Sequence, residues 1–180
     1  MIRNTLRRTG ALAALAGIVL LTGCATSANR EAMTAGSIAS AKKNPYSLSV
    51  KTGGGNQTSA MGSSEISNDD LRAAIEKSVA QSALFKEVVQ GKNGDYELSV
   101  TVARLSKPLF GASFTVDMEA GWSLIKSSDK SVVMRKSITS SYTASMSDSL
   151  VGVTRLRLAV EGAARNNIKQ GLEAIAAMNL

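Results

Sequence analysis

The chain has 180 residues, of which 21 are Lys or Arg, 14 are Asp or Glu and none is His, so its formal net charge is +7. The absence of histidine excludes Ser-His-Asp and Cys-His nucleophilic pairs, histidine zinc sites and imidazole pH switches. A single cysteine cannot form a disulfide within the chain, so the stability of the fold must come from packing. The basic residues are scattered along the sequence, which argues against nucleic-acid binding.

The N-terminal segment has the charge order and length of a secretory signal. Three arginines lie within the first eight residues, and residues 11–21 form an apolar run. That run is too short to span a bilayer comfortably, so we interpret residues 1–23 as a cleavable signal peptide. Removing 23 of the 180 residues leaves 157, with 18 basic and 14 acidic side chains, which is the length of a single domain.

The apolar run closes on Leu21, Thr22, Gly23 and Cys24. A buried structural thiol is the alternative reading of Cys24, but the small and polar residues after it offer no core to join. The tetrapeptide resembles the lipobox of bacterial lipoproteins, which implies cleavage before Cys24 and acylation of its thiol. One acyl chain binds a bilayer weakly, at about 0.8 kcal/mol per methylene, so several chains, palmitate among them, are implied. Ala25 stands where aspartate would retain such proteins, which implies the periplasmic face of the outer membrane rather than the inner membrane.

The first part of the remaining chain is predicted to hold a tether, a strand, a helix and a short strand. Low apolar content predicts a lipidated cysteine with a flexible tether over 24–45, followed by one periplasmic domain over 46–180. Alternation of apolar and polar residues predicts a strand over 46–51, and glycines predict a flexible loop over 52–64. Ser67 and the acids after it predict a helix start, and its apolar stripe extends to about residue 84. Residues 85–90 form a short strand candidate.

The second part is predicted to be a β-meander closed by a long helix. Alternation predicts strands at 96–103, 114–124 and 132–142, each with one polar face, and a helical stripe covers about 154–178. Each helix has one apolar stripe and the sheet has one apolar face. We therefore predict an α+β two-layer sandwich, with a mainly antiparallel sheet of four or five strands and two helices on one face.

Several features are candidate sites of chemistry. The glycine run at 53–55 is not followed by the Gly-Lys-Ser/Thr of a phosphate loop, so a connector is favoured. The neighbouring carboxylates Asp69 and Asp70 are better explained by the helix start, and Asp117 and Glu119 by the wet face of a strand. No nucleophile elbow occurs, although a Ser-Lys pair remains an open alternative. We expect no enzyme activity, no metal and no cofactor other than the lipid on Cys24.

Two surface features are candidates for contact with a partner or with lipid. A basic row on the last helix consists of Arg157, Arg165 and Lys169, and a solvated helix face is its simpler explanation. Leu109 and Phe110 lie in a loop after Pro108, where filling of the core is their expected role. If they were exposed, they would mark an apolar contact site.

The order of lipobox, strand, helix, meander and helix is similar to that of several small envelope lipoproteins. Residues 67–89, 96–105 and 152–177 carry a resemblance in pattern to YajG-type lipoproteins, and more loosely to auxiliary lipoproteins of ABC-type lipid transport and to the lipopolysaccharide-assembly lipoprotein. The resemblance implies a non-enzymatic accessory or binding role in cell-envelope biogenesis, with the bilayer and an envelope protein or lipid as partners. A lipid-binding auxiliary subunit of an ABC-type transporter is the alternative, and a cryptic hydrolase is a third reading.

Overall fold

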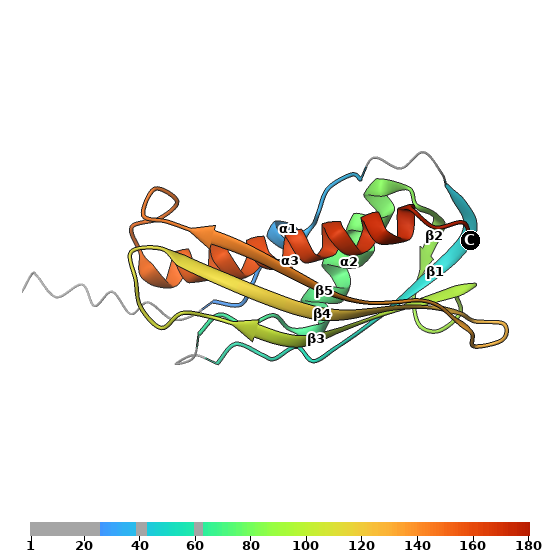
Figure 1. Cartoon of the computed structure of the whole chain (residues 1–180), viewed down its shortest axis with the longest axis horizontal. Coiled ribbons are helices and arrows are strands. Elements are labelled where there is room, and N and C mark those ends of the chain that lie inside the picture. The colour runs from blue at the N-terminus through green and yellow to red at the C-terminus, as the bar shows by residue number, and fades with distance from the viewer. Residues whose placement is uncertain (1–25, 39–42, 60–62) are drawn as a thin grey trace, which may run out of the picture.

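The structure, a computed structural model, describes residues 26–38, 43–59 and 63–180. The predicted signal peptide and the lipobox at residues 21–24 lie outside the described residues. The elements follow in the order α1 (Arg30–Met33), β1 (Asn44–Gly53), α2 (Asn68–Ser82), β2 (Phe85–Val89), β3 (Tyr96–Ser106), β4 (Phe114–Lys126), β5 (Val132–Ala144) and α3 (Gly152–Ala176) (Figure 1).

The five strands form one sheet in the order β2-β1-β3-β4-β5. β3, β4 and β5 pair antiparallel as the alternation predicted, but β1 pairs parallel with both of its neighbours, so the sheet is mixed. A parallel pair needs a crossover connection, and α2 supplies it between β1 and β2. The loop from β2 to β3 then passes β1 at Gly94, where a Cβ would lie 2.5 Å from the amide nitrogen of Ser49.

Helices cover one face of this sheet, which confirms the α+β two-layer architecture. α3 lies against β4 and β5, α2 lies against β1 and β2, and α1 packs between α2 and α3 (Figure 1). The alternate residues of β3 and β4 that face the helices are buried, whereas the residues between them are exposed or half-buried. The large side chains that are fully buried include Trp122, Leu124, Ile168 and Leu172, so apolar side chains fill the space between the layers.

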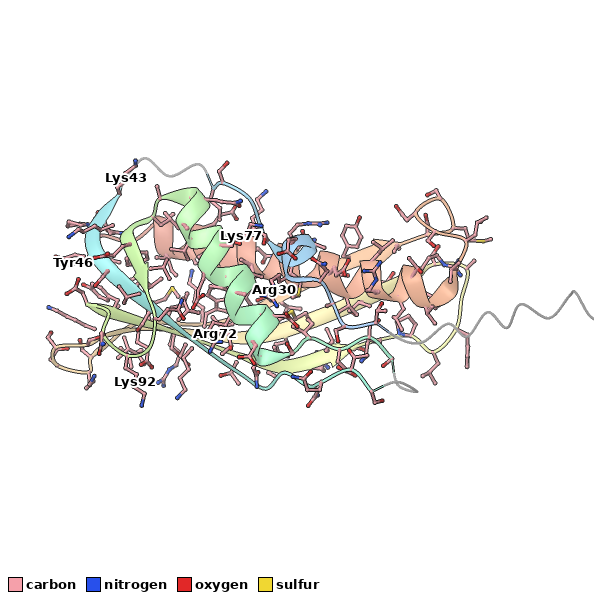
Figure 2. All side chains as sticks on the ribbon, turned by 180° about the vertical axis from the view of Figure 1, so that it is seen from behind. Arg30, Lys43, Tyr46, Arg72, Lys77 and Lys92 are labelled. Carbon is pink, nitrogen blue, oxygen red and sulfur yellow. The ribbon has the colours of Figure 1, made fainter. Side chains whose placement is uncertain are left out.

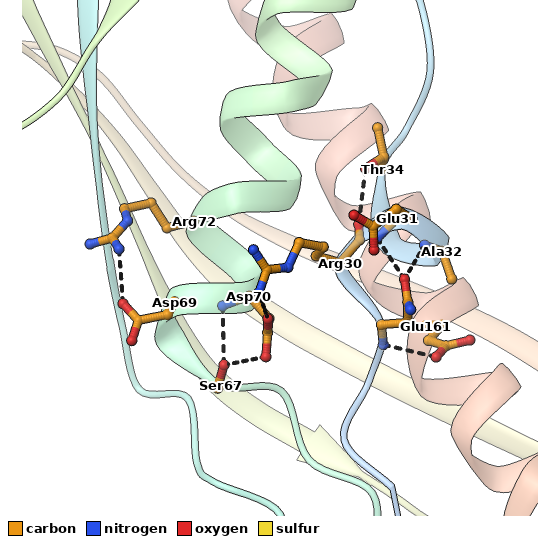
Figure 3. Close-up of polar contacts among 10 residues, drawn as sticks. Arg30, Glu31, Ala32, Thr34, Ser67, Asp69, Asp70, Arg72 and Glu161 are labelled. Carbon is orange, nitrogen blue, oxygen red and sulfur yellow. Dashed lines mark hydrogen bonds and ion pairs between the residues drawn. The ribbon is translucent and has the colours of Figure 1, made fainter.

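The start of α2 uses the residues that predicted it. The Ser67 hydroxyl accepts a hydrogen bond from the Asp70 amide at 3.0 Å and donates one to the Asp70 carboxylate at 2.6 Å. Asp70 also pairs with Arg30 of α1 at 3.2 Å, and Asp69 pairs with Arg72 at 2.9 Å (Figure 3). Both acids therefore support the start of the helix, and Asp70 also joins it to α1, which confirms their structural interpretation.

Residues 26–38 differ from the flexible tether that was predicted for them. Ala28, Met33 and Ile38 are buried, with Met33 fully so. The Asn29 amide donates to Glu161 of α3 at 2.9 Å (Figure 3), and Arg165 of α3 donates to the carbonyl oxygen of Ala32 at 3.0 Å. The apolar residues of this segment show no periodic spacing, because single side chains pack between two helices. The helix α1 is also only four residues long.

Candidate functional site: an apolar tip

Among the described residues, six large apolar side chains are exposed at one end of the molecule. The exposed fraction reaches 86% for Leu109, 84% for Phe110 and 80% for Leu150. Monomeric proteins seldom leave several such side chains in water together, so the group is a candidate contact site. We call it the apolar tip, and it consists of Leu109, Phe110, Met146, Leu150, Val151 and Val153.

The sheet brings the two loops of the apolar tip to the same end. Residues 107–113 join β3 to β4, and residues 145–151 join β5 to α3. Phe114 at the start of β4 pairs with Ala144 at the end of β5, so the first loop ends and the second loop begins beside this pair. Figure 1 shows the two loops together at one end and the C-terminus at the other.

Arg155, in the first turn of α3, links the two loops. Its Nη1 donates to the carbonyl oxygens of Ser149 at 2.9 Å and Leu150 at 3.0 Å, and its Nη2 donates to that of Gly111 at 3.4 Å. The guanidinium lies 5.4 Å from the centre of the Phe114 ring, within the range of a cation–π contact. One side chain thus fixes the position of both loops.

No carboxylate among the described residues compensates the buried charge of Arg155. The residue is 7% exposed, its Nε has no hydrogen-bond partner, and within the described residues no Asp or Glu pairs with it. A buried charge is costly unless polar groups compensate it, and here three backbone carbonyl oxygens provide that compensation. The carbonyl groups of the loops are in turn satisfied by the guanidinium.

Loop 145–149 is closed by polar contacts of its own. The Asp148 carboxylate accepts hydrogen bonds from the Ser145 amide at 2.7 Å and the Ser145 hydroxyl at 3.0 Å. These two bonds, the backbone one foremost, hold the pKa of Asp148 below its usual value. The Met146 side chain takes no part in closing this turn, and it is 52% exposed.

The first described residues are bound beside this tip. The Ser64 hydroxyl donates to the carbonyl oxygen of Thr26 at 2.9 Å, and Lys107 Nζ donates to the carbonyl oxygen of Ser64 at 3.1 Å. Lys107 also forms an ion pair with Glu65, whose carbonyl oxygen accepts from the Ala28 amide. The N-terminal segment is therefore joined to the residue at which the loop between β3 and β4 begins.

Among the predicted contact residues, Leu109 and Phe110 are exposed, so the expectation that they fill the core is wrong. The basic row of α3 is divided among separate contacts. Arg157 pairs with Glu161 at 3.5 Å, and Lys169 pairs with Glu173 at 4.0 Å. Arg165 is held by the carbonyl oxygen of Ala32, as described above, and lies over the ring of Tyr142. A role for this row in binding a partner stays a prediction.

Sequence reasoning missed the second loop and Arg155. The pair Leu150–Val151 directly follows a polar loop and precedes a helix, and two adjacent apolar residues at such a junction were the available signal. Arg155 carried no signal, because a basic residue in a helix is usually solvated.

Two polar grooves lie elsewhere on the described surface. One of about 450 Å³ is lined by Tyr46, Asp95, Lys92, Lys126 and Lys130 among others, at the end opposite the apolar tip. Figure 2 shows Tyr46 and Lys92 there.

A second groove, of about 220 Å³, includes Gly55, whose amide donates to the Asn68 side chain at 2.8 Å. That amide is therefore already engaged, which agrees with the rejection of a phosphate loop. In the ranges that the structure describes, no three metal-ligating side chains gather, and no helix is long and apolar enough to cross a membrane.

No family model matches the chain, and no curated protein matches it. Among solved structures, the fold is similar to that of a Xanthomonas campestris protein of the DUF330 family, with 16% identity, 79% of this chain and 91% of that chain covered, and a TM-score of 0.61. The hypothetical protein CT253 of Chlamydia trachomatis has 6% identity, coverages of 75% and 96%, and a TM-score of 0.55. A minor lipoprotein of Acinetobacter baumannii has 11% identity, coverages of 76% and 94%, and a TM-score of 0.42. The TM-scores of the first two proteins show that they share the fold of this chain.

Proposed function

We propose that this protein is a lipoprotein of the bacterial cell envelope, acylated on Cys24 and held at the periplasmic face of the outer membrane. Its role is that of a non-enzymatic accessory or binding protein in envelope biogenesis or maintenance, as the resemblance to YajG-type lipoproteins implies. The observation that carries the proposal is the Leu21-Thr22-Gly23-Cys24 tetrapeptide after a basic and apolar leader. Thr26, two residues later, is already bound to the domain.

The packing of the core favours this role over that of a lipid carrier. A carrier needs an apolar cavity for acyl chains, whereas the layers here are filled by fully buried side chains such as Trp122 and Leu172. The acids considered for catalysis are engaged in a helix cap, or lie on the polar face of the sheet where Glu119 contacts Arg104 and Ser137. A binding surface at the apolar tip is therefore the better-supported site of action.

Acylation is tested in the full chain with its own leader, produced in an enterobacterial host supplied with labelled palmitate. Wild type is expected to incorporate the label and to lose the mass of residues 1–23. Cys24→Ser is expected to lose the label and to stay uncleaved, because only a thiol can receive the lipid before cleavage.

The matched control is Ala25→Asp, which keeps the thiol. It is expected to stay labelled but to move from the outer-membrane to the inner-membrane fraction of a density gradient. Labelling of Cys24→Ser at the wild-type level would contradict the proposed anchor. An unlabelled wild type would contradict it as well.

A further inference from the structure

The apolar tip lies beside the segment that leads to Cys24. We infer that the tip inserts into the same bilayer that receives the acyl chains, so that the domain stands on the membrane in one orientation. The inference rests on the proposed acylation of Cys24, because that lipid determines which surface the domain meets. It adds a second membrane contact, made by side chains rather than by lipid.

The distance that the chain can span places the lipid near the tip. Thr26 is bound to Ser64, and Ser64 is bound to Lys107, which is two residues before Leu109. Cys24 lies two positions before Thr26, and two residues span at most about 7 Å even when the chain is fully extended. Acyl chains on Cys24 therefore enter the bilayer close to the apolar tip, and the domain cannot be held far above the surface.

Exposed apolar side chains on both loops suit the tip to insertion into a membrane. Leu109 and Phe110 on one loop and Leu150 on the other are each at least 80% exposed, and apolar side chains gain free energy when they leave water. Insertion also requires that backbone polar groups be satisfied. The Arg155 guanidinium already binds three carbonyl groups of these loops, so they need no water. Because the loops are fixed in advance, insertion involves little loss of conformational freedom.

Charge alone would favour the other end of the molecule. Lys92, Lys126 and Lys130 line a groove there and would be attracted to anionic headgroups. The strand β4 has 13 residues, which corresponds to about 40 Å between the two ends. The segment from Cys24 to Thr26 is far too short to bridge that length. The position of the acyl chains therefore determines which end meets the bilayer, and the lysine groove faces away from it.

Depth-dependent quenching tests the inference. Because acylation consumes the only thiol, a new cysteine is the single free thiol of the mature lipoprotein. Phe110→Cys and Leu150→Cys, each labelled with an environment-sensitive fluorophore, are reconstituted in vesicles of phosphatidylethanolamine and phosphatidylglycerol that contain a lipid spin-labelled on its acyl chain. Lys92→Cys is the matched control at the opposite end. Both tip labels are expected to shift to the blue and to be quenched several-fold more strongly than the control label.

The outcomes separate this inference from the proposed function. The intact mass of each sample reports acylation, so a missing lipid mass would contradict the proposed function. A full lipid mass with tip labels quenched no more than the Lys92→Cys label would overturn only the insertion. If the tip labels are shielded from aqueous iodide in isolated envelopes but not in protein-free vesicles, the tip binds a protein partner and the bilayer contact is wrong.

Discussion

At the scale of single residues, buried polar groups determine how α3 meets the sheet. The Trp122 indole N–H donates to the Asn167 side chain at 2.9 Å, and the Asn167 amide donates to the carbonyl oxygen of Ile138 at 2.9 Å. Ser140 donates to the carbonyl oxygen of Ala163 at 2.8 Å. Since each of these groups is buried, a helix shifted along the sheet would leave donors unpaired, and the network therefore selects one register.

Replacement of Asn167 is expected to be costly for this reason. Asn167→Ala leaves the buried indole N–H without an acceptor, which costs about 1–3 kcal/mol of unfolding free energy. Urea denaturation followed by tryptophan fluorescence measures the change, because Trp122 is the only tryptophan. The neighbouring Asn166→Ala removes an exposed contact and is expected to change stability by less than about 1 kcal/mol. Equal effects of the two variants would contradict the role of the network.

Asp148 makes the loop 145–149 sensitive to acid. Its pKa is lowered in the folded state, so the carboxylate stabilises the loop above the usual aspartate range, and that contribution is lost as the pH falls below about 4 towards the folded pKa. An NMR titration of the Asp148 carboxyl carbon should show a midpoint below that of an ordinary aspartate. Ser145→Ala removes one of the two donors and should raise the midpoint, whereas Ser141→Ala on β5 should leave it unchanged.

At the scale of the elements, α3 approaches the sheet closely because its inner face is made of small residues. Ala159, Gly162, Ala163 and Gly171 are all buried along it. At Gly171 a Cβ would lie 2.5 Å from carbon atoms of the Trp122 ring, which is closer than real contacts allow. The large side chains of the sheet thus occupy space that the helix leaves open.

Gly171→Ala is expected to destabilise the protein even though alanine favours helices. The intrinsic gain of about 1 kcal/mol is outweighed by overpacking against a rigid indole, which costs typically 1–3 kcal/mol and more when backbone must move. Thermal denaturation measures the net effect, which should be a lower midpoint. The exposed neighbour serves as the control, and Gln170→Ala should leave the midpoint unchanged or slightly raised. A higher midpoint for Gly171→Ala would show that α3 can shift away from the sheet.

At the scale of the whole molecule, residues 26–38 connect the predicted anchor to both long helices. Met33 is fully buried between α2 and α3, and the segment is bound to Glu161 and Arg165 of α3. With the acyl chains that we propose on Cys24, a domain joined in this way would have a defined orientation. A free tether of the same length would allow it to tumble above the membrane.

Met33→Asp is expected to release this segment while the sheet stays folded. A buried carboxylate without a partner is strongly unfavourable, and α1 contacts α2 and α3 rather than the strands of the sheet. Hydrogen exchange should show faster exchange at the amides of Ala28 and Thr34 and unchanged exchange in β4. Glu31→Ala, at an exposed position of α1, should change neither. Loss of protection in β4 would mean that the segment is an integral part of the core.

The sequence predicted the strands and both long helices because their periodicity is local. Tyr96 to Val102 alternate, and Ser67 marks a helix start, so these elements needed no distant partner to be recognised. The parallel pairing of β1 depends on which strands lie beside it, and no local pattern reports this. Met33 could not be recognised as a core residue, because its two partner helices are distant in the sequence. The exposure of Leu109 and Phe110 likewise depends on a neighbouring loop that starts 35 residues after Phe110.

If the chain is exported as proposed, the contacts between residues 26–38 and α3 also impose an order of events on its folding. Asn29 and Glu161 are separated by 132 positions, and Ala32 and Arg165 by 133. A protein that crosses a membrane with its N-terminus first releases α3 last, and contacts over such separations form slowly. The segment next to Cys24 therefore remains accessible while the rest of the chain emerges, and it docks only after the final helix is present.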